Sequence, residues 1–167
     1  MQRYEMMQGN GVEPNHITFV SILKACTRSI EALDLGRLIH GDIMLKDHMT
    51  ATVVDNALIE MYIKCGSLNL AQQVFDKLSV RNTVLWTALI AAYADYGDGH
   101  DALKCLDKMQ LEGFSPNYVT FICSLKACGN VGAAEKGQDI HLEMERQGLL
   151  EGDYVIGNAL VDMYAKC

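Results

Sequence analysis

The sequence repeats itself at an offset of 102 residues, and this repeat restricts the possible folds more than any other feature. The segment Thr18–Cys26 returns as Thr120–Cys128, and Asn56–Cys65 returns as Asn158–Cys167. The only two prolines of the chain are separated by the same interval. Self-similarity over several separated blocks is the signature of stacked repeats, in which each unit packs mainly on its neighbours. Thr18–Cys26 and Thr120–Cys128 are apolar at helical spacing, so we expect both to be helices.

Apolar residues within each period recur at the spacing of amphipathic helices. One apolar stripe runs through residues 57–65, and Gly66 follows it as a candidate left-handed cap. A second stripe through residues 71–78 predicts a second helix, so the two helices form a hairpin. No segment alternates as a strand would. We predict an all-α fold, a right-handed superhelical solenoid of stacked antiparallel helical hairpins (an α-α superhelix) like that of tetratricopeptide arrays.

These hairpins divide the chain into units. The expected order is the end of one unit in residues 1–15, complete units in 16–51, 52–82, 83–117 and 118–153, and the start of another in 154–167. The complete units are 36, 31, 35 and 36 residues long. A single hairpin cannot bury its apolar face alone, so stacked neighbours must cover it. We therefore expect the chain to be part of a longer array, with flanking repeats packed against both ends.

The charge of the chain bears on its partners. The formal net charge of −7 argues against tight nucleic-acid binding, because contacts with phosphate usually require an excess of Lys and Arg. Lysines gathered on one face could still bind RNA. The sequence has no stretch of about 18 uninterrupted apolar residues, so we expect no membrane span.

The residues that could carry chemistry have structural explanations. Four of the six cysteines fall at matching repeat positions and none forms a Cys-x-x-Cys pair, so we expect reduced thiols without a metal or disulfide. His40 and His141 recur after Ile, which favours a satisfied core polar group over catalysis. Phe19 and Trp86 are expected to pack between hairpins. His141-Leu-Glu143 matches half of a zinc deaminase motif, but no Pro-Cys-x-x-Cys follows. We predict a chain that is not an enzyme and has no cofactor.

Three stretches resemble the plant pentatricopeptide repeat (PPR) proteins: Asn56–Gly66, Val84–Ile90 and Thr120–Cys128. The unit lengths are similar to the PLS subclass of that family, with 16–51 and 118–153 as long repeats, 52–82 as a short one and 83–117 as an ordinary one. The resemblance implies sequence-specific binding of single-stranded RNA, one base per repeat. It also implies a mitochondrial or chloroplast RNA-processing factor, acting on an organellar transcript in C-to-U RNA editing, with editing accessory proteins as further partners.

The resemblance also assigns roles to positions within each repeat. The second residue is aliphatic and packs against base faces; here these residues are Ile17, Val53, Val84, Val119 and Val155. The fifth residue contacts the Watson–Crick edge of one base; here these residues are Val20, Asn56, Thr87, Ile122 and Asn158. The last residue assists it; here these residues are Asn15, Ala51, Asn82, Asn117 and Asp153.

The family's code would assign a pyrimidine, C more than U, to Asn56 with Asn82, and adenine to Thr87 with Asn117. The two long repeats depart from the pattern, because their fifth residues are aliphatic and lack a hydrogen-bonding group. They would act as spacers or contact bases weakly. The expected RNA site has the form 5′-N-Y-A-N-3′.

Three alternatives stay open. Asn56 and Thr87 could each cap a helix instead of contacting a base. Lys64 and Lys166 match positions near the RNA backbone, but a Lys near the end of a helix also suits the helix dipole. The whole chain could be a protein-binding helical scaffold without RNA contact, which the negative charge favours and the Asn and Thr fifth residues disfavour.

Overall fold

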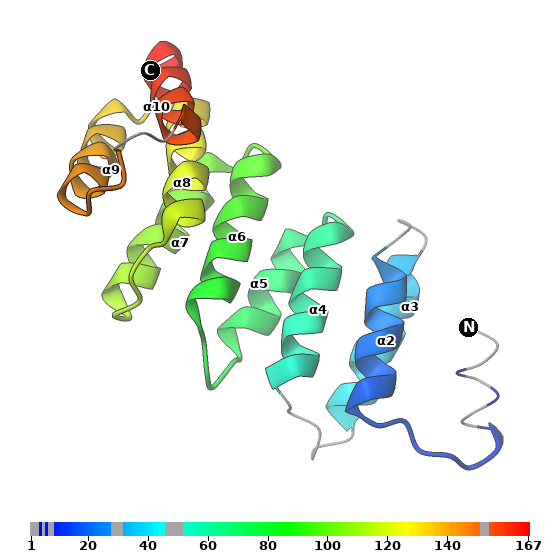
Figure 1. The fold of residues 1–167 in the computed structure, drawn as a ribbon. Coiled ribbons are helices and arrows are strands. Elements are labelled where there is room, and N and C mark those ends of the chain that lie inside the picture. Colours follow the sequence, from blue (N-terminus) through cyan, green and yellow to red (C-terminus); the bar gives the residue numbers. More distant parts are fainter. Residues whose placement is uncertain (1–3, 5, 7–8, 28–31, 46–51, 151–153) are drawn as a thin grey trace. The chain divides into compact units, whose positions relative to one another are not determined.

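The described part of the chain is all helical. The computed structural model describes residues 4, 6, 9–27, 32–45, 52–150 and 154–167. These residues contain helices and no strand, so the predicted all-α fold of helical hairpins is confirmed (Figure 1). The chain divides into two compact units, residues 1–80 and residues 81–167.

The first unit contains two hairpins. Its helices are α2 (His16–Cys26), α3 (Ala32–Leu45), α4 (Thr52–Lys64) and α5 (Leu68–Asp76). Helix α2 packs on α3 and α4, and α4 packs on α3 and α5 (Figure 1). Phe19, Tyr62 and Phe75 are among the largest fully buried side chains of this unit. The apolar stripes predicted for this region therefore form its core, with Phe19 packed as expected.

The second unit continues the same plan. Its helices are α6 (Thr83–Asp95), α7 (Gly99–Leu111), α8 (Tyr118–Val131), α9 (Ala134–Arg146) and α10 (Tyr154–Lys166). Helix α8 packs on all four others of the unit, so the first helices of successive hairpins, α6, α8 and α10, lie in one layer (Figure 1). Trp86 on α6 is fully buried, as expected for a packing residue. Among the described residues, no helix is long and apolar enough to cross a membrane.

Two helices are longer than predicted. Helices α2 and α8 begin at His16 and Tyr118, two residues before the predicted starts, because an Asn side chain caps each of them. Helix α8 also continues to Val131, where Gly132 at φ +67° ends it in the left-handed conformation. Gly66, at φ +71°, has the left-handed conformation that the sequence predicted. Apolar periodicity located these helices, but the caps decide where they end.

The internal repeat is also a repeat of packing, although the glycines involved are 101 residues apart and their methionine partners 102. Gly36 on α3 and Gly137 on α9 each leave space for a methionine of the following helix. A Cβ atom on Gly36 would lie 2.6 Å from the sulfur of Met61, and one on Gly137 would lie 2.5 Å from the sulfur of Met163. Both glycines are therefore kept by close helix packing, one in each unit.

Candidate nucleic-acid interface

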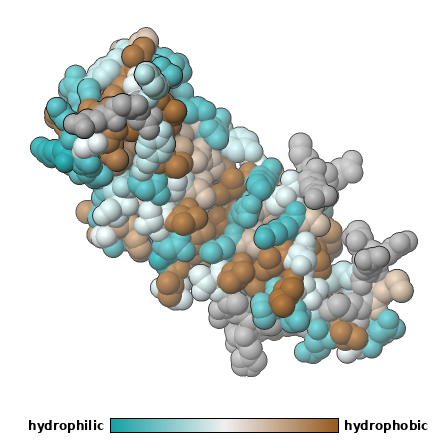
Figure 2. Space-filling model, viewed as in Figure 1, coloured by the Kyte–Doolittle hydropathy of each residue, from teal (hydrophilic) through white to brown (hydrophobic). Residues whose placement is uncertain are grey.

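The aliphatic side chains at the second position of each first helix are exposed. The exposed fraction of these residues is between 49% and 74%. They are Ile17, Val53, Val84, Val119 and Val155. Figure 2 likewise shows apolar residues exposed among polar ones on the face it draws. The core does not use these side chains, and they recur at one place in five helices. Such positions can cover flat apolar partners, since fully burying a Val or Ile contributes about 1.5–3 kcal/mol.

The asparagines at the last position of three repeats are helix N-caps. The Oδ1 atoms of Asn15, Asn82 and Asn117 accept hydrogen bonds from backbone N–H groups three residues later, at 3.0, 3.0 and 2.9 Å. Each cap satisfies one of the N–H groups that a helix leaves unpaired at its start. Because Oδ1 is occupied, the Nδ2 amino group is the part of each amide that is left for other partners.

Thr87 lies in the second turn of α6 and is almost fully buried. Its hydroxyl donates to the carbonyl of Thr83 at 2.8 Å and lies 2.7 Å from the hydroxyl of Thr120 on α8. Asn117 Nδ2 donates to Thr87 Oγ1 at 3.4 Å. The fifth and last residues of the repeat at 83–117 are thus brought together, although 30 residues separate them.

Asn56 lies in the second turn of α4 and is partly buried. Its Oδ1 atom is buried and has no hydrogen-bond partner among the described residues. A buried acceptor without a hydrogen-bond partner is costly in free energy. Asn56 belongs to the first unit and Asn82 to the second, so this code pair has no common geometry here. Asn56 and Thr87 both lie inside helices and not at the position before the first turn. The alternative that these two residues cap helices is therefore wrong.

The other fifth and last positions are less informative. Val20 and Ile122 are partly exposed, on α2 and α8, and Asn158 is exposed on α10. Ala51 and Asp153 lie outside the described residues.

Lys64 and Lys166 each form an ion pair with an acid one turn earlier. Lys64 Nζ lies 2.8 Å from Glu60, and Lys166 Nζ lies 2.6 Å from Asp162. About half of each lysine side chain is exposed, so these pairs add little stability. Both lysines lie in the last turn of their helices, where the dipole also favours them. Both the dipole role and a backbone-contact role therefore stay open.

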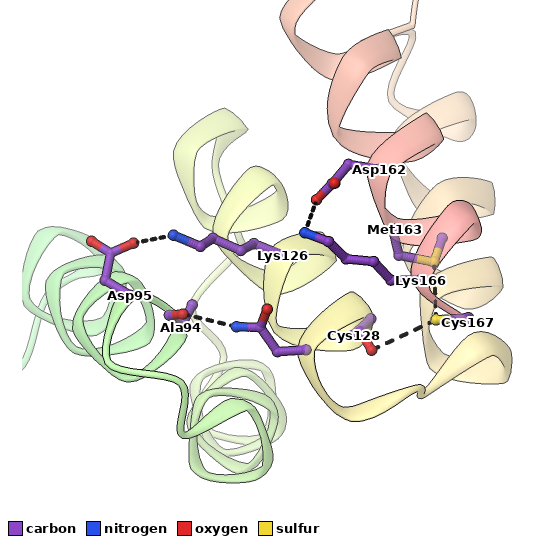
Figure 3. A network of polar contacts seen from close by, with 9 residues as sticks. Ala94, Asp95, Lys126, Cys128, Asp162, Met163, Lys166 and Cys167 are labelled. Atoms are coloured by element: carbon purple, nitrogen blue, oxygen red, sulfur yellow. Dashed lines mark hydrogen bonds and ion pairs between the residues drawn. The ribbon is translucent and has the colours of Figure 1, made fainter.

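Figure 3 shows a further lysine, Lys126 on α8, that reaches Asp95 on α6. The two side chains meet at 2.8 Å. In the same view Lys166 turns back to Asp162 on its own helix. Lys64, Lys126 and Lys166 are each paired with a carboxylate, so the charges of these three lysines are compensated.

The repeated histidines bond to repeated tyrosines. His40 Nδ1 lies 2.9 Å from the hydroxyl of Tyr62, and His141 Nδ1 lies 3.0 Å from that of Tyr164. Burial and the charge of Lys77 lower the pKa of His40. Both histidines thus contact a polar partner, as predicted, but the His141–Tyr164 contact is exposed and is not part of the core.

The cysteines are structural. All six are free thiols, and that of Cys65 donates to the carbonyl of Cys26 at 3.7 Å. The thiol of Cys167 likewise donates to the carbonyl of Cys128 at 3.6 Å (Figure 3). Burial raises the pKa of the Cys128 thiol to about 11, which disfavours its reactive thiolate. Within the described ranges, no group of three or more His, Cys, Asp or Glu side chains could hold a metal ion.

Sequence reasoning missed Thr120, whose side chain contacts both Thr87 and Asn117. It is fully buried, and its hydroxyl contacts both members of the pair. The signal was present as the spacing Asn-x-x-Thr, which occurs at Asn15 and Thr18 and again at Asn117 and Thr120. An N-cap residue followed three positions later by a side chain that returns to it is a capping-box pattern.

Comparison with known proteins identifies the repeats. A model described as "PPR repeat family" matches residues 81–130, and one described as "PPR repeat" matches residues 56–82. Pentatricopeptide repeat-containing protein At4g16470 of Arabidopsis thaliana is 37% identical, over 95% of this chain and 31% of that protein. Pentatricopeptide repeat-containing protein At4g18520, chloroplastic, of the same plant is 38% identical, over 92% of this chain and 25% of that protein.

Solved structures agree with these matches. The crystal structure of the pentatricopeptide repeat protein PPR10 from maize matches with a TM-score of 0.75 and 26% identity, over 98% of this chain and 24% of that chain. PPR10 in complex with an 18-nt psaJ RNA element matches with a TM-score of 0.74 and 24% identity, over 96% of this chain and 24% of that chain.

The helical hairpins, their internal repeat and the capped first helices define an α-helical repeat protein. The chain belongs to the pentatricopeptide repeat family. It spans 31% and 25% of the length of the two Arabidopsis relatives named above. The two matching models both describe repeats.

Proposed function

We propose that this chain binds single-stranded RNA sequence-specifically, with one base held at each repeat whose fifth residue is polar. The contact between Thr87 and Asn117 carries the proposal. These residues stand near opposite ends of one repeat, yet their side chains meet at 3.4 Å. A base edge placed against this pair meets groups from both residues, as recognition by a repeat requires.

The state of the Asn117 amide favours particular bases. Its Oδ1 is occupied by the helix cap, so the amide offers an N–H donor. Adenine and cytosine have a ring-nitrogen acceptor at the centre of the Watson–Crick edge, whereas guanine and uracil have an N–H there. A donor therefore favours A or C, and the short Thr87 side chain leaves room for the larger purine, so we assign adenine.

For the neighbouring repeat, only the donor argument at the last residue applies, because Asn56 and Asn82 belong to different units. Asn82 is also an N-cap, so it also offers an N–H donor. The longer Asn56 side chain leaves room for a pyrimidine only, so we assign C more than U to this repeat. Asn158 is exposed on α10 and is the fifth residue of the next repeat. The proposed site under the complete repeats is 5′-N-Y-A-N-3′.

Exposed aliphatic residues supply the contact with base faces. Val84 and Val119 begin α6 and α8, two helices that pack together, and 74% and 49% of these residues is exposed. Ile17, Val53 and Val155 occupy the same position elsewhere. Apolar contact with base faces does not depend on sequence, so it adds affinity while Thr87 and Asn117 add selectivity.

A double substitution tests the assignment. We expect Thr87→Asn with Asn117→Asp to shift the preference at one base from A towards U, because the longer amide fills the purine space and Asp presents an acceptor. Fluorescence anisotropy with four RNA oligonucleotides that differ at this base, at low and moderate salt, measures the preference. Asn69→Asp, which adds the same charge on an exposed site of α5, is the control. An unchanged preference in the double variant would refute the assignment.

At the level of the whole protein, we propose a mitochondrial or chloroplast RNA-processing factor. Several of the Arabidopsis relatives are named as chloroplastic or mitochondrial proteins. C-to-U editing of an organellar transcript, aided by editing accessory proteins, is the proposed process, and the PLS-like alternation of repeat lengths supports it. PPR10 itself is bound to RNA in one of the matched structures.

A protein-binding scaffold is the second candidate. The net charge of −7 and the pairing of Lys64, Lys126 and Lys166 with acids both favour it, because phosphate contact needs uncompensated cations. The same binding series separates the two candidates. Absence of binding to all four RNAs at low salt would favour the scaffold.

A further inference from the structure

We propose that Thr120 is a positioning residue for the adenine preference of the repeat at 83–117, an inference that rests on the proposed function. Thr120 is the third residue of the following repeat, and it is fully buried between α6 and α8. Its hydroxyl lies 2.7 Å from Thr87 Oγ1 and 3.0 Å from Asn117 Oδ1. One side chain thus contacts both residues that are proposed to recognise the base.

The hydrogen-bond count shows what this contact does. Two hydroxyl protons serve three oxygen–oxygen contacts: Thr87 with Thr83 O, Thr87 with Thr120, and Thr120 with Asn117 Oδ1. The carbonyl oxygens can only accept, so both protons stay within the cluster in every arrangement. Neither hydroxyl has a proton for a base. One N–H of Asn117 Nδ2 donates to Thr87 Oγ1, so the second N–H is the donor that this pair offers to a base.

Thr120 also fixes which end of the amide points outward. Asn117 Oδ1 accepts from both the backbone N–H and the hydroxyl of Thr120, at 2.9 and 3.0 Å. A reversed amide would set its amino group against the backbone N–H, so two donors hold Oδ1 inward. Without the Thr120 hydroxyl, one donor remains and the reversed amide becomes more frequent. Its outward oxygen would accept from the N1–H of guanine, so discrimination between A and G would weaken.

Thr18 provides a matched control. It lies 102 residues before Thr120 and makes the same two bonds to its own cap, with its N–H and hydroxyl 3.0 and 3.1 Å from Asn15 Oδ1. It belongs to the first unit, whereas Thr87 and Asn117 belong to the second. Thr18→Val therefore removes an equivalent cap bond without touching the proposed adenine pair.

The test compares the affinity for RNA carrying A with that for RNA carrying G at this base. We expect Thr120→Val to lower the A-to-G affinity ratio about three- to tenfold, the equivalent of one neutral hydrogen bond. Thr120→Ser, which keeps the hydroxyl, and Thr18→Val should keep the ratio within about twofold of the unsubstituted chain. NMR amide spectra report whether each variant is folded, and Thr120→Ala replaces Thr120→Val if the latter is not.

The outcomes separate this inference from the proposed function. If Asn117→Asp alters the preference but neither Thr120 variant without the hydroxyl does, the positioning role is refuted and RNA recognition stands. If Thr120→Ser loses the ratio as Thr120→Val does, the hydroxyl is not responsible and the inference is likewise overturned. If the unsubstituted chain does not distinguish the two RNAs, the proposed function fails first.

Discussion

Asn117 combines two tasks that substitutions can separate. Its Oδ1 caps α8, and its Nδ2 contacts Thr87 and is the proposed donor to adenine. Asn117→Ala removes both tasks. Asn117→Asp keeps an oxygen at the cap but replaces the donor with a second acceptor. Stability and base preference should therefore respond differently to the two substitutions.

The expected magnitudes follow from the bonds that each substitution removes. Replacing an Asn N-cap by Ala costs about 0.5–2 kcal/mol, and here the Thr120 hydroxyl also loses its acceptor. We therefore expect a loss of about 1–2 kcal/mol for Asn117→Ala. Asp is as good an N-cap as Asn, and its charge at a helix start contributes about 0.3–1 kcal/mol. The second carboxylate oxygen will face Thr87 Oγ1, which offsets part of this gain, so Asn117→Asp should leave stability almost unchanged.

Urea unfolding followed by circular dichroism measures the stability, and the anisotropy series measures the base preference. For Asn117→Asp we expect near-normal stability and a preference moved from A to G, because Thr87 still leaves room for a purine while the new acceptor suits the guanine N1–H. If Asn117→Asp is as unstable as Asn117→Ala, the Oδ1 cap is not what holds α8. If it folds normally and still prefers A, the outward N–H does not determine the base.

Two further predictions concern stability alone. Gly99→Ala should destabilise the chain by about 1–3 kcal/mol, because the new Cβ would lie 2.7 Å from the backbone oxygen of Ala127. Gly157→Ala is the control and should be neutral or slightly stabilising, because a Cβ there would have no neighbour within 4 Å. Equal urea midpoints for the two variants would contradict this prediction. Because burial and Lys77 lower the pKa of His40, the unfolded state binds its proton more tightly. The stability contribution of a neutral His40 should be complete above the unfolded pKa of about 6.5 and decline as the pH falls through the lower folded value. Urea midpoints between pH 7.5 and 5 should then fall more steeply than in His40→Gln, and parallel curves would argue against this account.

The sequence predicted the hairpins well because their signal is local. Apolar spacing identifies a helix and the face it buries, so the stripe at residues 57–65 located α4, and the repeat located its counterpart α10. Close packing left a weaker signal. Gly36 and Gly137 stand opposite methionines of the next helix, and only the three-dimensional contact shows why no side chain fits there.

The alternative that Asn56 and Thr87 cap helices was wrong for a physical reason. Asn56 and Thr87 are good cap formers, and composition alone made them candidates for that role. Capping depends on the place of a residue relative to the first helical turn, and the caps found here are at the last positions instead, at Asn82 and Asn117 among others. Thr87 lies 30 residues before Asn117 and 33 residues before Thr120, so no local pattern could predict its hydrogen bonds with these two residues.

The coincidence of cap and base contact limits how such a repeat can change its preference. A last residue that cannot cap would cost its helix about 0.5–2 kcal/mol, so the residues open to this position are mainly Asn, Asp, Ser and Thr. Among these, Asn and Asp can occupy the cap with one terminal atom and still present a second. Asn presents a donor and Asp an acceptor, so exchanging them reverses the hydrogen-bond preference while the cap remains. At Asn82 and Asn117, the need to cap the helix thus limits the last residue to presenting either a donor or an acceptor to the base. The fifth residue then selects between purine and pyrimidine by its size.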